Sequence, residues 1–366
     1  MTTEAMEVIE KDLKENYPDS TEAECFRFVQ AAKAIHRKAS KKLDKEKLLR
    51  DTASEKLGEY LEWRTLYGTD YDKPAEDADD KTVWDWAARK ALLAEETKKQ
   101  EAEEKRASDN KQVGIRKFGF GFGKKKENAT DKPQPVDYDS IMENAMREEE
   151  EAADASTGNN EDSGGQADTA KTDDSEDTGI ERTIQRPKTL RQIIFRRKHP
   201  ETGEHLTDKN GADLIHVLPA RIDRFAADNE TWATAVALYI EASVDRNSKY
   251  TATIFVDARA GEGWPNPVLI MVVSLIGQIV TEINERHPER CKSLIIFPLP
   301  RALTMVWGSV KGFFGPEIQE MMTVFNGASD IDSPFPRDRL EAHVEGDTLD
   351  FLERCRTDLF EPKDKD

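Results

Sequence analysis

The sequence predicts an α/β fold in which a mostly parallel β-sheet is covered by helices and follows a separate helical domain. Two observations lead to this prediction. After residue 186, runs of β-branched and aromatic residues of strand length alternate with helix patterns, which is typical of a covered parallel sheet. Before residue 95, apolar residues recur instead at spacings near three and four, as an amphipathic helix requires.

The helical domain is predicted to span residues 1–95. Apolar side chains gather in three stretches of it, at 25–29, 57–67 and 83–93. We expect Asp19 or Ser20 to cap one helix, because short polar side chains favour that position. Gly68 stands where the second apolar stripe ends, and glycine is typical of a helix end. These features predict a small bundle of helices.

Residues 96–185 are expected to form a charged, largely disordered linker. The formal charge of the whole chain is 54 − 73 = −19, and residues 148–177 alone hold twelve acids against Lys171. A segment of this composition buries too little apolar surface to offset chain entropy. The remaining chain then carries only −8. A general nucleic-acid binder driven by overall basicity is excluded, and no nucleic-acid partner is expected.

The α/β domain is predicted over residues 186–345, with a short helix and a charged tail over 346–366. Its predicted strands are 213–222, 250–256, 293–299 and 321–325, and its predicted helices are 229–244 and 268–286. The longest apolar run, 268–280, has thirteen residues, fewer than the ~20 that cross a bilayer, so it indicates a buried helix.

Several segments, in this order, resemble the CRAL-TRIO family of lipid-binding and lipid-transfer proteins. They are ECFRFVQAAK (24–33), EYLEWRTLYG (59–68), TDKNGADLIHVLPARID (207–223), TIFVDARAGEG (253–263), the stretch from INERHPER (283–290) to FFGPE (313–317), and MMTVFNG (321–327). The resemblance covers about residues 20–68 and 186–330. It implies an apolar pocket with the sheet as its floor and helices as its walls, which holds the tail of one lipid.

The resemblance also implies which residues would line this pocket and close it. Pocket candidates stand at alternate strand positions: Ile215, Val217, Ile254, Val256, Ile295 and Phe297, or their neighbours. The sequence does not fix which face they share, because both faces of such a sheet are covered. In the family, a helix after the last central strand acts as a gate. The matching gate residues here are Leu303, Val306, Trp307, Val310, Phe313 and Phe314. A static core packed on the sheet is the alternative.

Recognition of a lipid headgroup is where the chain departs from the phosphatidylinositol-transfer members. The family's Glu is kept as Glu289, but its strand hydroxyls fall at Ala252 and Ile254 and its Lys at Met321. Without that Lys, the charge that would pair with an inositol phosphate is missing. A less polar lipid is expected. Glu289 is the headgroup candidate, with a structural pairing to Arg286 or Arg290 as the alternative.

No motif of an enzyme is found, so no catalytic residue, metal site or cofactor is expected. GFGFG at 119–123 follows no strand and precedes KKK rather than a helix, unlike a phosphate-binding loop. His216 stands in an apolar strand and is expected to be a core or pocket histidine. Asp257 ends a strand, and the resemblance implies that it holds the following turn.

Two basic stretches predict contact with an anionic membrane surface. Residues 33–50 carry eight basic residues against two acids, a local +6. Residues 115–126 place phenylalanines between cations, which suits a headgroup interface or RNA binding. The predicted membrane contacts are Arg37, Lys38, Lys41, Lys42, Phe118, Phe120, Phe122, Lys124, Lys125 and Lys126. A solvated helix face, or a linker docked on the acidic tract, is the alternative.

The sequence favours a soluble, cytoplasmic protein that binds a small hydrophobic lipid, exchanges it at membranes through a gated apolar pocket, and contacts membranes peripherally. The three cysteines are widely spaced, which suits a reducing compartment, and the acidic start of the chain lacks the apolar segment of a signal peptide. The alternative is a non-catalytic adaptor that uses the α/β domain and the charged linker to bind a protein such as a small GTPase.

Overall fold

The structure is a computed structural model, and it describes residues 2–36, 45–75, 77–116, 189–248, 251–267, 269–299 and 316–359. Met1–Asp109 and Thr189–Asp366 together form one compact unit. The described helices are α1 (Thr3–Asn16), α2 (Glu22–Ile35), α3 (Lys45–Tyr67), α4 (Asp80–Arg116), the 3₁₀ helix η1 (Pro219–Arg221), α6 (Asn229–Ser243), α7 (Leu269–Arg286), α9 (Pro316–Met321), α10 (Arg337–Leu340) and α11 (Gly346–Thr357).

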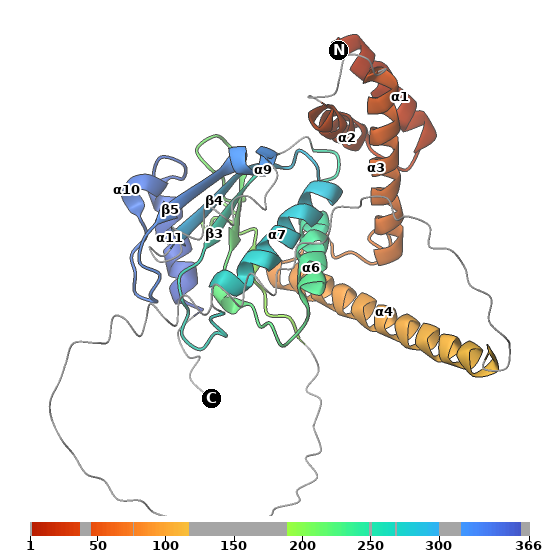
Figure 1. The fold of residues 1–366 in the computed structure, drawn as a ribbon. Coiled ribbons are helices and arrows are strands. Elements are labelled where there is room, and N and C mark those ends of the chain that lie inside the picture. The colour runs from red at the N-terminus through yellow and green to blue at the C-terminus, as the bar shows by residue number, and fades with distance from the viewer. Residues whose placement is uncertain are drawn as a thin grey trace, which may run out of the picture. The chain divides into compact units, whose positions relative to one another are not determined.

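The sheet has five strands in the order β1-β2-β3-β4-β5. Their bounds are β1 (Ile194–Phe195), β2 (Asp213–Val217), β3 (Ala252–Asp257), β4 (Cys291–Leu299) and β5 (Met322–Asn326). The short edge strand β1 pairs antiparallel with β2, and the other pairs are parallel. The predicted α/β class with a mostly parallel sheet is therefore confirmed (Figure 1).

Helices cover both faces of the sheet. Figure 1 shows α6 and α7 on one side and α10 and α11 on the other. The α6–α7 side belongs to a large hydrophobic cluster that also contains Leu57 of α3 and Trp84 of α4. Leu349 and Leu352 of α11 pack on the opposite side, in a smaller cluster. The N-terminal helices therefore share a continuous core with one face of the sheet.

Local chemistry sets the ends of several elements. The expected cap at Asp19 or Ser20 is wrong by one or two residues, because Thr21 caps α2. The Thr21 hydroxyl accepts from the backbone N–H of Glu24 at 3.1 Å, and the Glu24 carboxylate accepts from that of Thr21 at 2.7 Å. Gly68 follows the end of α3 with φ +62°, as the sequence predicts.

Two predicted boundaries differ from the structure. The strand expected over 213–222 ends at Val217, and η1 follows, because Pro219 has no N–H to donate to a neighbouring strand. The boundary expected at residue 95 falls inside α4, which continues to Arg116. Side chains 96–108 of that helix are all exposed, as their charged composition requires. Within the described residues, no helix has the length and apolar character needed to cross a membrane.

Candidate functional site

The six predicted pocket residues lie on two different faces of the sheet. Ile215, Ile254 and Val256 belong to the cluster under α6 and α7, with Val217 half-buried beside them. Ile295 and Phe297 belong to the cluster under α10 and α11. The structure therefore brings the first four together and separates the other two from them.

The neighbours of Ile295 and Phe297 occupy the α6–α7 face instead. Leu294 pairs with Ile254, and Ile296 pairs with Val256, so these residues complete one apolar surface across the three central strands. Four half-buried apolar side chains border this surface. They are Ile276 and Ile279 of α7 and Met322 and Val324 of β5. We call this surface, formed by Ile254, Val256, Leu294 and Ile296, the apolar floor; its side chains are 7% exposed or less.

Glu289 lies in the turn between α7 and β4, where it has a φ of +62°. It borders a surface hollow of about 500 Å³, which residues of α2 and the start of α3 also line. The other lining residues are Gln30, Lys33, Ala34, His36, Lys45 and Leu49. The neighbouring Arg286 donates to Glu282 at 3.3 Å, and Arg290 donates to the Asp245 carbonyl at 2.9 Å. The hollow thus combines two ammonium groups with one carboxylate.

Sequence reasoning did not predict the lysines of this hollow. Lys33 lies in the last turn of α2 and Lys45 begins α3, about 250 residues before Glu289 in the chain. No local pattern links such distant positions, because only the tertiary fold brings α2 beside the turn after α7. The basic stretch at 33–50 was the available signal, but it indicated a membrane surface rather than a hollow.

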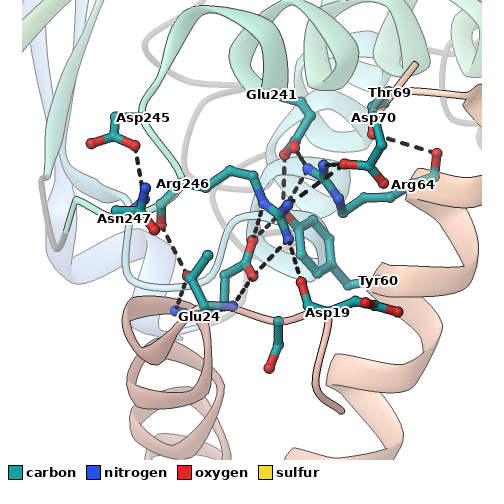
Figure 2. A network of polar contacts seen from close by, with 12 residues as sticks. Asp19, Glu24, Tyr60, Arg64, Thr69, Asp70, Glu241, Asp245, Arg246 and Asn247 are labelled. Carbon is teal, nitrogen blue, oxygen red and sulfur yellow. Dashed lines mark hydrogen bonds and ion pairs between the residues drawn. The ribbon is translucent and has the colours of Figure 1, made fainter. Parts of the chain in front are cut away.

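A buried polar network fastens α2 and α3 to the loop after α6 (Figure 2). The hydroxyl of Tyr60 lies 2.9 Å from a carboxylate oxygen of Glu24 and 3.0 Å from one of Glu241. Arg246 donates to both oxygens of Glu24, at 2.9 and 3.0 Å, and Arg64 pairs with Glu241. The charges of the two glutamates are thereby each opposed by an arginine.

The network controls the protonation of its members. Burial alone would raise the pKa of Glu24, but hydrogen bonds and the charge of Arg246 outweigh it, so the pKa lies below its ordinary value. Burial and the charge of Glu24 raise the pKa of Tyr60 to about 12. Burial lowers the pKa of His287 to about 3, and its neutral ring lies with Nε2 3.1 Å from the carbonyl of Ala237. Glu24 is therefore ionised and His287 neutral at physiological pH.

Asp257 holds the turn after β3, in agreement with the sequence-based expectation. Its carboxylate accepts from the buried Arg259 at 2.7 Å, and Arg259 also reaches Glu353 of α11 at 2.6 Å. His216 is fully buried in β2 on the α10–α11 face, and burial lowers its pKa well below the ordinary value. Among the described residues, no three carboxylate, histidine or cysteine side chains are grouped as metal ligands.

The predicted gate and membrane-contact residues lie outside the described residues. These are Leu303, Val306, Trp307, Val310, Phe313 and Phe314 for the gate, and Arg37, Lys38, Lys41, Lys42, Phe118, Phe120, Phe122, Lys124, Lys125 and Lys126 for the membrane. Both sets remain predictions from the sequence.

Comparison with known protein families matches residues 202–346 to the family described as CRAL/TRIO domain. The matched range runs from the loop before β2 to the start of α11 and contains the apolar floor and Glu289. A search among curated proteins found no match to the chain.

Proposed function

The chain belongs to the CRAL/TRIO family through residues 202–346, and on that premise we propose that it carries one lipophilic molecule and exchanges it at membranes. Domains of this family generally bind lipophilic ligands. The observation that supports a ligand here is the apolar floor on the α6–α7 face, with half-buried apolar side chains along its border. Such a surface retains a lipid tail by burial alone, at about 0.8 kcal/mol per CH₂ group. No covalent chemistry is required.

The ligand's tail is proposed to lie on Ile254, Leu294 and Ile296, between Ile279 of α7 and Val324 of β5. All five side chains belong to one hydrophobic cluster or pack against it. This site keeps Ile254 of the predicted pocket and uses Leu294 and Ile296 in place of Ile295 and Phe297. This replacement of residues follows from the register between β3 and β4, because Leu294 and Ile296 are the partners of Ile254 and Val256.

The polar end of the ligand is proposed to lie in the hollow beside Glu289. This turn leads directly into β4, whose Leu294 and Ile296 form part of the apolar floor. Lys33 and Lys45 can pair with an anionic group, while the Glu289 carboxylate accepts from hydroxyl or ammonium donors. A lipid with a compact polar head fits these groups.

Residues 301–314 are proposed as the gate. β4 ends at Leu299 and the parallel strand β5 begins at Met322, so a crossover connection joins them. Crossovers of this kind are right-handed in about 98% of cases, which favours the face that already carries α6 and α7. Phe314→Asp should then slow lipid transfer between vesicles without unfolding the protein. Unchanged transfer would remove the gate assignment.

The binding proposal is tested by extracting protein purified from a eukaryotic host with organic solvent and analysing the extract by mass spectrometry. Wild type should yield lipid in stoichiometric amount. Ile279→Trp adds bulk to the floor's border and should lower the yield, whereas Leu66→Trp, at a 75% exposed position of α3, should not. Absence of lipid from correctly folded wild type would contradict the proposal.

The adaptor function is the second candidate, and the exposed part of α4 favours it. Side chains 96–108 of this helix are exposed and mostly charged. A helix that is polar on all sides gains nothing from the core, so contact with a partner is one use for it. An extract without lipid, together with stable protein, would support this function instead.

A further inference from the structure

An aromatic side chain projects into solvent at the carboxyl edge of the sheet. Phe225, in the loop between η1 and α6, is 81% exposed, and the guanidinium of Arg224 lies 4.6 Å from the centre of its ring. A large exposed aromatic residue beside cations is typical of an interaction surface. We call Phe225 together with Arg191, Arg221, Arg224 and Trp264 the arginine–aromatic surface.

The loop after β3 is built to place Trp264 in this surface. Asn266 donates its backbone N–H to the carbonyl of Ala220 at 3.0 Å, which fastens this loop to η1. Its side-chain oxygen accepts from the N–H of Gly261 at 2.6 Å. A side chain at Gly261 would overlap the ring of Trp264, so glycine is needed for this arrangement. Trp264 is therefore held in a defined position.

Two arginines lie against the same loop. Arg221 stacks on Trp264, with its guanidinium 5.1 Å from the ring centre, and its Nε donates to the carbonyl of Gln192 at 2.6 Å. Arg191 donates to the carbonyl of Gly263 at 3.3 Å. Residues before β1, after β2 and after β3 thus meet at one edge, since β1 runs antiparallel to β2.

The surface is locally positive in a chain of net charge −19. Two acids, Asp223 and Glu262, stand beside its residues in the sequence. The Asp223 carboxylate accepts from the backbone N–H of Phe225 at 2.9 Å, and Glu262 is exposed at the loop tip. Burial and the charge of Arg191 lower the pKa of Arg221 to about 10, so Arg221 is still charged at neutral pH. A nearby anion would stabilise this pair of cations.

We propose that the arginine–aromatic surface docks the protein on an anionic bilayer, with Phe225 inserted among the headgroups and the arginines against lipid phosphates. Arginine pairs with phosphate oxygens through paired donors, and an aromatic ring is stable at the headgroup boundary. The proposal deepens the lipid-exchange function and rests on it. β4 also ends at this edge of the sheet, at Leu299.

Sedimentation with phosphatidylcholine vesicles, with and without phosphatidylserine, tests the docking. The variant is the double substitution Arg224→Gln and Phe225→Ser, at two exposed positions. The matched control is Arg89→Gln with Tyr71→Ser, which also removes one exposed arginine and one exposed aromatic ring. One cation near such a surface is worth about fivefold in affinity, so the variant should lose at least about fivefold on phosphatidylserine vesicles.

The control should bind these vesicles like wild type, and added salt should weaken wild-type binding. Equal binding of variant and wild type, or equal wild-type binding to vesicles without phosphatidylserine, would overturn the docking proposal. Lipid content, measured on the same preparations, separates the two proposals. Wild type that binds vesicles through Phe225 but carries no lipid would refute lipid carriage and leave the docking surface standing. If wild type carries lipid but the double variant binds vesicles as well as wild type does, the docking proposal is refuted and lipid carriage stands.

Discussion

Arg246 and Glu24 form a two-pronged ion pair that joins the loop after α6 to the start of α2. Both carboxylate oxygens accept, at 2.9 and 3.0 Å, and the Glu24 side chain is fully buried. The same carboxylate also completes the capping box of α2. One glutamate therefore orders a helix end and attaches the N-terminal helices to the α/β region, 222 residues away in the chain.

Removal of Arg246 should destabilise the protein through the charge it leaves behind. In Arg246→Ala, Glu24 keeps its negative charge in a buried site without its main partner. Breaking a buried pair costs about 3–5 kcal/mol. Because Arg246 is 22% exposed, we expect a smaller loss of about 2–3 kcal/mol. Urea unfolding measures the loss of stability, and Arg89→Ala, at an exposed position, serves as control. If Arg246→Ala is as stable as wild type, the ion pair does not stabilise the fold.

Arg259 forms ion pairs with two carboxylates that differ in burial, so the contribution of each pair to stability can be compared. Asp257 is fully buried, whereas Glu353 of α11 is 38% exposed. Arg259→Met should cost about 3–5 kcal/mol, because the buried Asp257 loses its closest partner. Glu353→Gln should cost less than about 1 kcal/mol, since solvent screens an exposed charge. The prediction fails if thermal or urea unfolding gives the two variants similar losses.

The neutral His287 should make stability depend on pH. Its pKa is about 3 in the folded protein against 6.5 for an ordinary histidine, so between these values the unfolded chain binds more protons. Stability is then complete above pH 6.5 and falls as the pH drops toward 3. The slope from this residue is at most about 1.4 kcal/mol per pH unit.

His287→Gln removes this contribution and can retain a side-chain donor to the Ala237 carbonyl. Melting temperatures from pH 7.5 downward should fall less steeply in this variant than in wild type. His199→Gln, in the loop after β1, serves as the matched control for the loss of one histidine. If His287→Gln and wild type show the same pH dependence, the histidine is not held neutral by the fold.

The sheet and its helices could be predicted because hydrophobic periodicity is local. β3, β4, α6 and α7 each stand within about two residues of the predicted ranges. The lining of the pocket could not be predicted in the same way. Residues 294–299 are all buried, so no alternation in β4 distinguishes one face of the sheet from the other. Only the pairing with β3 shows that Leu294 and Ile296 share the face of Ile254.

The polar contacts that join the N-terminal helices to the α/β region could not be predicted from the sequence either. Glu24 carried a signal, since Thr21 and Glu24 have the spacing of a capping box, but its partner Arg246 lies in a loop with no motif. Tyr60 was assigned only to an apolar helix stripe, and its hydroxyl proved to contact two buried carboxylates. Such contacts join residues that are distant in sequence, and their chemistry becomes visible only when the fold is known.

Native mass spectrometry of the purified chain measures lipid carriage most directly. We predict a complex heavier than the 41.5 kDa polypeptide by the mass of one lipid, which is lost on denaturation. The Ile279→Trp variant should show less of this heavier species, and Leu66→Trp the same amount as wild type. A folded wild type that appears only at the mass of the bare polypeptide, after purification from a lipid-rich host, would contradict lipid carriage.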